Sequence, residues 1–360
     1  PKAEGWQLAS QPDIVIDMGR TFNVQSEGTV RYKYFEVDPG FKEHKWIRAA
    51  ELKPGDPEVV HHILALVRKP GLDRRGLAGG GEFLAAYVPG LRAAPYPKGA
   101  AKFVPAGSKL IFQLHYTPIG EARKDRSRIG LYFADDDEVE KVVLTQRAST
   151  GGRLRIPPGD SNYRTTASTA SRYSCELLAL MPHMHLRGKS FRYELEHANT
   201  RQVVLNVPQY DFNWQTVYRL REPIQISRGT RMLCTAHFDN STENLNNPDP
   251  ARTVTWGDQT WDEMMIGYYD IAVDRSQLPA ETFEQPKKPN HREPTEEELN
   301  ARTFPLLNRF DADGDGKIQK TEVDNNYQFL FRRLDSNDDG ELTRAELSRL
   351  PAVRKKKNEP

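Results

Sequence analysis

Two histidines one residue apart, His183 and His185, lie in the apolar stretch Ala179–Lys189. Alternate residues of a β-strand point to the same face, so a strand here would present both imidazoles side by side. Such a pair can hold a metal ion. An isolated His-x-His is nevertheless more often an ordinary pair on a half-buried strand, so the other histidines of the chain must decide between the two interpretations.

Three further histidines stand in strand-like stretches that could pair alongside each other: His61, His62 and His115. Adjacent strand residues face opposite sides, so His61 and His62 can reach one ion only if their strand twists or bulges. Three imidazoles suit copper or zinc. The sequence therefore predicts a first metal site at these histidines.

A second, chemically softer site is indicated by Met264, which could complete a set with His183 and His185. A thioether is a poor ligand for zinc, calcium or magnesium and a good one for copper(I). Five histidines in matched strands, with a methionine near two of them, favour two metal sites of different ligand type.

Two acidic loops near the C-terminus match the calcium loop of the EF-hand. The first offers ligands at Asp311, Asp313, Asp315, Lys317 (by its carbonyl) and Glu322, and the second at Asp335, Asn337, Asp339, Glu341 (by its carbonyl) and Glu346. Each has glycine at its sixth position, and Ile318 and Leu342 could pair across a short sheet. The pattern predicts two Ca²⁺ sites, in a structural or extracellular-type module rather than a sensor.

The elements that must position these residues are mostly strands. Helical periodicity is scarce before the acidic loops, while Val, Ile, Tyr and Phe alternate with polar residues, which favours antiparallel sandwiches. We expect a mainly β chain of two jelly-roll-like β-sandwiches (1–140 and 141–283), a proline-bearing linker (284–294) and an all-α EF-hand pair (295–360). The stretch Pro70–Pro105, rich in Gly, Ala and Pro, is expected as a long functional or mobile loop.

The strands that we expect in the first sandwich are Asp13–Asp17, Arg31–Val37, Lys45–Ala49, Val59–Val67, Lys109–Tyr116 and Ser127–Phe133. Those in the second are Tyr173–Met181, Ser190–Glu196, Gln202–Val207, Met232–Phe238 and Met264–Val273, with a shorter one before the turn at Pro157–Asp160.

Composition narrows the class of protein. The formal net charge of +1 gives no indication of a nucleic-acid partner, and no apolar run is long enough to span a bilayer. The chain begins at Pro1 without an initiator methionine or a signal sequence, which predicts a processed product or a piece of a larger protein. Its two cysteines, Cys175 and Cys234, are either one disulfide or two buried thiols.

Four blocks together resemble the copper type II, ascorbate-dependent monooxygenases, the family of peptidylglycine α-hydroxylating monooxygenase and dopamine β-monooxygenase. The blocks are His61-His62, Gln113–Tyr116, His183–Lys189 and Asp262–Met264 with Tyr268-Tyr269 beyond. Their order and spacing agree with the family over about residues 12–275. The resemblance implies two β-sandwiches that carry one copper each and face each other across a solvent cleft.

By this resemblance, His61, His62 and His115 hold the electron-transfer copper, with Gln113 nearby, and His183, His185 and Met264 hold the copper where oxygen reacts. The implied activity is hydroxylation of a substrate C–H bond by O2, with electrons from ascorbate or another donor. Tyr268 matches a substrate-contacting tyrosine. Such chemistry belongs outside the reducing cytosol, so we expect a periplasmic or secreted protein with a Cys175–Cys234 disulfide.

Departures from the family concern the substrate. The peptide-acting enzyme has an arginine where this chain has Met181, and an asparagine where it has Ile266, so we do not expect peptide amidation, and the substrate is a small or peptide-like molecule. The insertion at 239–250 and the calcium module resemble bacterial members. His237 is a spare imidazole that either ligates the second copper or forms hydrogen bonds in the loop.

Two other interpretations compete with a copper hydroxylase. One is a non-catalytic copper- and calcium-binding module, although storage alone needs no second site of different softness. The other is a zinc hydrolase, which needs a carboxylate base beside three ligands. Glu263 is the one tempting base, and its neighbour Met264 argues against zinc.

Overall fold

The computed structural model describes residues 5–8, 10–71, 81–88, 90–198, 200–284, 296–324, 334–335 and 339–347. The chain divides into two compact units, Pro1–Pro286 and Lys287–Pro360, and each is described by itself. Except for its first residue, the expected linker at 284–294 lies outside the described residues.

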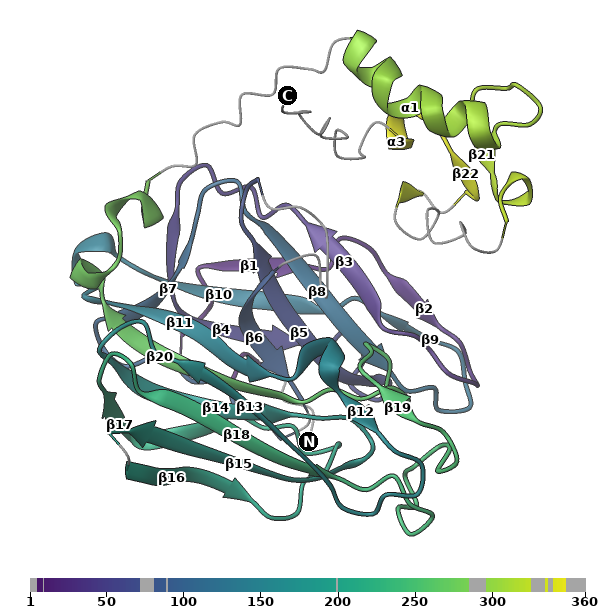
Figure 1. Cartoon of the computed structure of the whole chain (residues 1–360). Helices are drawn as coiled ribbons and strands as arrows, with labels where there is room; N and C mark the ends of the chain where they lie inside the picture. Colours follow the sequence, from purple (N-terminus) through teal and green to yellow (C-terminus); the bar gives the residue numbers. More distant parts are fainter. Residues whose placement is uncertain are drawn as a thin grey trace, which may run out of the picture. The chain divides into compact units, whose positions relative to one another are not determined.

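The N-terminal half of the first unit consists of two antiparallel layers around one apolar core (Figure 1). Its strands are β1 (Ile14–Asp17), β2 (Phe22–Val24), β3 (Lys33–Val37), β4 (Lys45–Lys53), β5 (Val60–Arg68), β6 (Glu82–Tyr87), β7 (Ala100–Val104), β8 (Lys109–Tyr116), β9 (Arg123–Asp125) and β10 (Arg128–Ala134). One layer is β3-β8-β5-β6, the other contains β1-β10-β4-β7, and β2 and β9 form a separate ribbon. In β3, buried Phe35 stands between outward-facing neighbours, as expected for a strand with one face on the core.

The C-terminal half repeats this arrangement around a second core. Its strands are β11 (Lys141–Ser149), β12 (Arg155–Ile156), β13 (Tyr163–Ala170), β14 (Cys175–His183), β15 (Gly188–His197), β16 (Thr200–Val207), β17 (Tyr218–Ile226), β18 (Arg231–Phe238), β19 (Val254–Thr255) and β20 (Ile266–Asp274). The layers are β13-β18-β15-β16 and β11-β20-β14-β17, with β12 and β19 paired apart from them. Short 3-10 turns are η2 (Asp136–Glu138), η3 (Gly151–Arg153), η4 (Arg275–Gln277) and η5 (Ala280–Thr282).

The two halves share one sheet. Strands β7 and β11 pair in parallel, which joins one layer of each half into the eight-stranded order β1-β10-β4-β7-β11-β20-β14-β17. Buried Lys102 on β7 reinforces the junction: its Nζ donates to the Thr145 hydroxyl at 2.6 Å and lies 3.6 Å from the Asp270 carboxylate. Both partners belong to the C-terminal half, so this ion pair fixes one half against the other.

The mainly β architecture is confirmed, with one correction. The stretch Pro70–Pro105 is not wholly a loop, because it contains β6 and β7. Strand β7 is buried along its whole length and carries Lys102 in its middle. It therefore lacks the apolar–polar alternation by which a half-buried strand is recognised.

The expected disulfide is wrong: Cys175 and Cys234 are both buried free thiols. They lie on different sheets, Cys175 on β14 and Cys234 on β18, where each is packed in the apolar core of the C-terminal half. Burial raises the pKa of both thiols, which keeps them protonated and unreactive.

The second unit contains the acidic loops. Helix α1 (Glu296–Phe310) leads into the first loop, and the described elements after it are β21 (Ile318–Gln319), η6 (Lys320–Glu322), β22 (Glu341–Leu342) and α3 (Arg344–Leu347). Ile318 pairs with Leu342, as expected, and both are fully buried in the small core of this unit.

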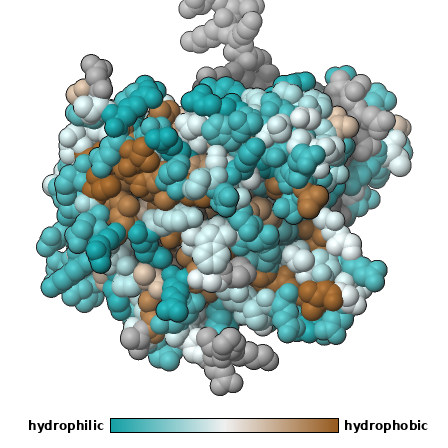
Figure 2. Space-filling view, turned by 90° about the horizontal axis from the view of Figure 1, so that it is seen from below, coloured by the Kyte–Doolittle hydropathy of each residue, from teal (hydrophilic) through white to brown (hydrophobic). Residues whose placement is uncertain are grey.

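Surface properties agree with the composition. On the face drawn in Figure 2, hydrophobic residues gather in patches among the hydrophilic ones that dominate. Within the described ranges, no helix combines the length and apolar character needed to cross a membrane.

Candidate metal centres

A β-bulge creates the first histidine group. On β5, Val60 is opposite Tyr116 and His62 is opposite His115, so His61 is an extra residue in the ladder. The bulge turns His61 toward the face that His62 and His115 already occupy. This is the distortion that the adjacent pair required if both rings were to reach one point.

The three rings offer nitrogens that lie within 4.8 Å of one another. The Nδ1 atoms of His61 and His62 are 3.3 Å apart, and Nδ1 of His115 is buried without a hydrogen-bond partner. Burial lowers the pKa of each ring, to about 3 for His115. Neutral imidazoles with converging lone pairs are the form that binds a metal ion.

Neighbouring side chains hold this group. Asn213 places its Oδ1 3.2 Å from Nε2 of His61, and the ring of Tyr32 packs against His62 and His115. Gln113, two residues before His115 on β8, donates to the hydroxyl of Tyr34 at 2.8 Å. Gln113 therefore lies on the same face as the histidines and is fixed by its own hydrogen bond.

The second group lies where β14 ends. His183 is the last residue of the strand and His185 lies in the turn before β15, so only one of them is on a strand. Their ring centroids are nevertheless 5.2 Å apart. Met184 between them points the other way, into the core of the C-terminal half, where it is fully buried.

Hydrogen bonds at the far nitrogen of each ring orient the pair. Nδ1 of His183 is 2.7 Å from Oε1 of Gln215, and Nδ1 of His185 is 3.2 Å from the carbonyl of Asp262. Both partners are acceptors, so each Nδ1 carries the proton and each Nε2 keeps its lone pair. Nε2 of His185 is buried without a partner. Burial lowers the pKa of His183 to about 4 and that of His185 to about 3.

Glu263 joins the two segments of the second group. Its fully buried carboxylate accepts main-chain N–H bonds from His185 at 2.8 Å, Arg187 at 2.7 Å and Met264 at 3.2 Å. Both oxygens are thus occupied by the backbone, which leaves Glu263 as a positioning residue and removes the base that a zinc hydrolase would need. Arg187 is equally committed, because it donates to Asn240 and to the carbonyl of Trp261.

Three other predicted site residues are Met264, Tyr268 and His237, and the structure places the first two on the segment after Glu263 and the third on the opposite sheet. Met264 is buried directly after Glu263, and the ring of Tyr268 is 6.4 Å from that of His183. His237 lies on β18, in the other sheet, where its Nδ1 is 3.0 Å from the Ser190 hydroxyl. The hydrogen-bonding role expected for His237 is the one that the structure supports.

Phe212 lies between the two histidine groups. Its ring stacks on His61 at a centroid distance of 5.4 Å and an interplanar angle of 12°. It is also 6.2 Å from the rings of His115 and His185. This buried ring therefore contacts histidines of both groups.

Sequence reasoning missed the segment that supplies these contacts. Phe212, Asn213 and Gln215 lie in the irregular connection between β16 and β17. No periodicity or spacing relates this connection to the histidines. His61 and His115 contact it because the two halves of the first unit pack together, and His183 and His185 contact it through the fold of their own half. For the positioning role of Glu263, the only indication in the sequence is that this residue directly precedes Met264.

In the second unit, the carboxylates of Asp311, Asp313 and Asp315 converge to within 4.8 Å of one another. Glu322 closes the first loop by accepting from the main-chain N–H of Ala312 at 2.8 Å and Gln319 at 2.7 Å. In the second loop, Asp335 accepts from the N–H of Asp339 and Gly340, and Glu346 accepts from Thr343. Lys317 and Glu341, whose carbonyls are the expected ligands, form an ion pair of side chains. Asn337 lies outside the described residues.

The first unit thus places two histidine groups on paired β-sandwiches, and the second unit carries converging carboxylates in an acidic loop. Comparison with known families specifies the class further. Residues 142–282 match the model "Copper type II ascorbate-dependent monooxygenase, C-terminal domain", and residues 306–324 and 328–351 match "EF hand". The second half of the first unit is thus similar to the copper type II monooxygenases and is followed by an EF-hand pair, so the resemblance seen in the sequence is confirmed for these residues.

Comparisons with curated proteins and with solved structures give no close relative of this chain. No curated protein matches the chain. Among solved structures, the major capsid protein P2 of bacteriophage PM2 is 7% identical over 72% of this chain and 99% of that chain, with a TM-score of 0.29. The infectious bursal disease virus Gt strain structure is 11% identical over 75% and 74%, with a TM-score of 0.19. Similarities this weak carry no argument about fold or function.

Proposed function

We propose that this protein is a copper-dependent monooxygenase that hydroxylates a substrate C–H bond with O2 and an external reductant such as ascorbate. The observation that carries the proposal is the pair of histidine groups on either side of Phe212, each with a buried ring nitrogen that has no hydrogen-bond partner. A buried polar atom without a partner is costly, and a metal ion at that atom removes the cost. The family match of residues 142–282 supports copper as the ion.

The residues fit copper. His61, His62 and His115 would hold one ion, and His183, His185 and Met264 the other. When bound, copper supplies one-electron redox chemistry and reacts with O2. The chain supplies the rest. Gln215 and the Asp262 carbonyl fix the ring tautomers. Glu263 holds the backbone of two ligands, and Phe212 packs against rings of both groups.

The alternative is a copper- and calcium-binding module without turnover. Oxygen uptake by the copper-loaded full chain, with ascorbate and a panel of C–H substrates, separates the two. We expect substrate-dependent uptake that is lost in His185→Gln, with one product hydroxyl per O2 consumed. Uptake that never depends on any substrate would refute the hydroxylase and favour the module.

We further propose that the EF-hand pair binds two Ca²⁺ ions and that the protein works outside the cytosol. Converging carboxylates at Asp311, Asp313 and Asp315 support calcium. The location rests on the copper and O2 chemistry alone, since the cysteines are free thiols. Calcium titration of the chelator-treated chain tests the first part, with two bound ions as the expected result.

A further inference from the structure

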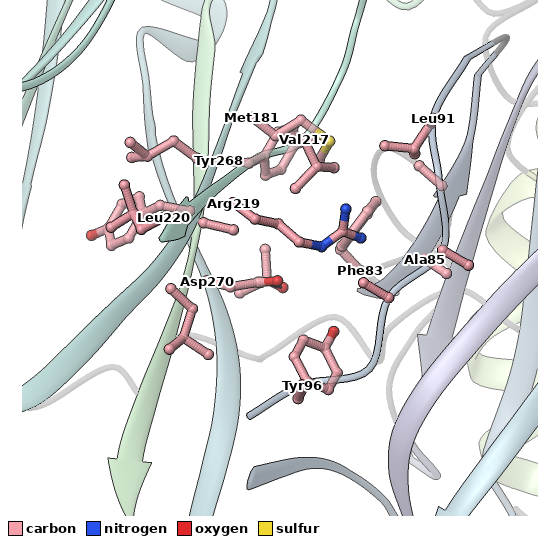
Figure 3. A pocket seen from close by; sticks show the side chains of 18 of the residues that line it. Phe83, Ala85, Leu91, Tyr96, Met181, Val217, Arg219, Leu220, Tyr268 and Asp270 are labelled. Atoms are coloured by element: carbon pink, nitrogen blue, oxygen red, sulfur yellow. Dashed lines mark hydrogen bonds between the residues drawn. The ribbon is translucent and has the colours of Figure 1, made fainter. Parts of the chain in front are cut away.

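A cavity of about 300 Å³ opens beside the second histidine group, between the two halves of the first unit (Figure 3). The N-terminal half contributes Phe83 on β6 and the segment around Leu91 and Tyr96. The C-terminal half contributes Met181 and Tyr268. Tyr268 also lies against His183, so the cavity ends next to the proposed oxygen-activating site.

The pairing of β11, β20, β14 and β17 shows how far the pocket residues on this sheet lie from the histidines. Residues opposite one another on neighbouring strands share a face, so they form rows. Moving away from the histidines, the rows are Ile266 and His183, then Arg147, Tyr268 and Met181, and then Thr145, Asp270, Ala179 and Arg219. Ala179 is four residues from His183, which places the last row roughly 13 Å along the sheet from the histidine.

The last row contains two charged residues, Asp270 and Arg219, and only Asp270 is in a buried ion pair. Lys102 and Asp270 form a buried ion pair and neutralise each other. Arg219 forms no ion pair within the described ranges, although Tyr96 and Asp270 interact with it electrostatically, and its one side-chain hydrogen bond runs from Nη1 to the carbonyl of Arg92 at 3.1 Å. In Figure 3 its side chain reaches into the pocket toward Phe83.

Two further arginines, Arg92 and Arg221, also line the pocket, and most of the other lining residues are apolar or aromatic, with Leu91, Val217 and Leu220 among the side chains drawn. A guanidinium that forms no ion pair, in a pocket lined by two further arginines and by apolar side chains, favours a planar anion that can accept two parallel hydrogen bonds. In the nearer row Met181 and Tyr268 line the pocket, whereas Arg147, which interacts with Tyr268, is exposed and is not a lining residue.

We propose that this pocket binds the substrate, and that the substrate is an organic carboxylate with an elongated apolar body. This inference rests on the proposed function. The carboxylate pairs with Arg219, the apolar chain passes Met181 and Tyr268, and the carbon to be hydroxylated lies beside His183. The separation of the rows excludes a short acid whose reacting carbon adjoins the carboxylate.

Binding to the copper-free full chain tests this directly. The probes are phenylacetate, 4-phenylbutanoate and 6-phenylhexanoate, each with its primary amide, and 4-phenylbutylamine, with affinities measured by isothermal titration calorimetry. We expect the acids to bind at least about tenfold more tightly than their amides, because the amide loses charge-assisted hydrogen bonds. Affinity should rise from phenylacetate to the longer acids.

Matched variants assign the effect to one residue. Arg219→Gln should weaken acid binding about tenfold and leave amide binding unchanged, whereas Arg219→Lys should retain part of the preference. Arg228→Gln, at an exposed arginine in the turn after β17, should change neither. Arg219 is itself exposed on the edge strand of its sheet, and equal urea midpoints for the variants would show that each is folded.

Several results would overturn the inference: no binding of any acid at millimolar concentration, equal binding of acid and amide, tighter binding of the amine, or a preference that survives Arg219→Gln. These outcomes do not depend on copper. If the chain binds no copper, the proposed function fails while the acid preference can still be observed. Conversely, O2 uptake together with equal acid and amide binding refutes only the inference.

Discussion

Replacing Glu263 with glutamine tests how the second histidine group is held. The wild-type carboxylate presents two acceptor oxygens to three main-chain N–H groups, those of His185, Arg187 and Met264. A glutamine amide keeps one acceptor and replaces the other with a donor. At least one buried N–H must then face another donor.

The size of the effect follows from these bonds. An unsatisfied buried N–H costs about 1–3 kcal/mol. Burial raises the pKa of Glu263 to about 8, so the comparison is made at about pH 9, where the wild-type group is ionised and the neutral amide also removes part of a desolvation penalty. We therefore expect Glu263→Gln to lower the free energy of unfolding of the copper-free chain by about 2 kcal/mol. Because two proposed ligands lose their common anchor, copper affinity at the second site should fall about 10–100-fold.

Urea denaturation followed by tryptophan fluorescence measures the first quantity, and competition with a chromophoric Cu(I) chelator measures the second. Glu222→Gln, an exposed glutamate on β17, is the matched control and should change neither. The first copper, at His61, His62 and His115, should bind with wild-type affinity in both variants. Wild-type stability together with two wild-type copper affinities in Glu263→Gln would refute the positioning role.

Three more predictions concern other parts of the chain. The free energy of unfolding of the copper-free protein should fall as the pH drops below 6.5, because His115 and His185 have folded-state pKa values of about 3 and bind fewer protons in the folded than in the unfolded state. In urea denaturation each ring should account for a loss of about 2 kcal/mol between pH 7 and pH 5. A free energy of unfolding that does not change over this range would contradict the prediction. Lys102→Met should lower the free energy of unfolding by about 3–5 kcal/mol, since it leaves the Asp270 carboxylate without its buried partner, and an unchanged urea midpoint would count against that ion pair. Glu322→Gln should reduce calcium binding by calorimetry from two sites to one, and two undiminished sites would show that Glu322 is not a ligand.

Much of the fold was predictable because it depends on local patterns. Strand β8 was predicted with its observed bounds, Lys109–Tyr116, since its residues alternate and turn signals flank it. The first calcium loop could also be predicted, because all its ligands lie at fixed positions within one short stretch of sequence. The β-bulge at His61 followed from a geometric requirement: two adjacent residues can share a face only when the ladder is interrupted.

Features that depend on how distant segments pack were not predictable. Phe212 contacts both histidine groups from an irregular connection, and the shared eight-stranded sheet arises from the pairing of β7 with β11. Cys175 and Cys234 illustrate the same limit. Both occupy one apolar core, yet they project from different sheets, and only the packing reveals that each is an isolated thiol.

The most direct test of the account is copper X-ray absorption spectroscopy of the full chain loaded with Cu(I). We predict two copper ions per chain, with nitrogen scatterers at both and a sulfur scatterer at only one of them. The sulfur signal should vanish in Met264→Ile while the copper bound at His61, His62 and His115 remains. One copper per chain, or the absence of a sulfur scatterer in the wild-type protein, would contradict a pair of copper sites with different ligand sets.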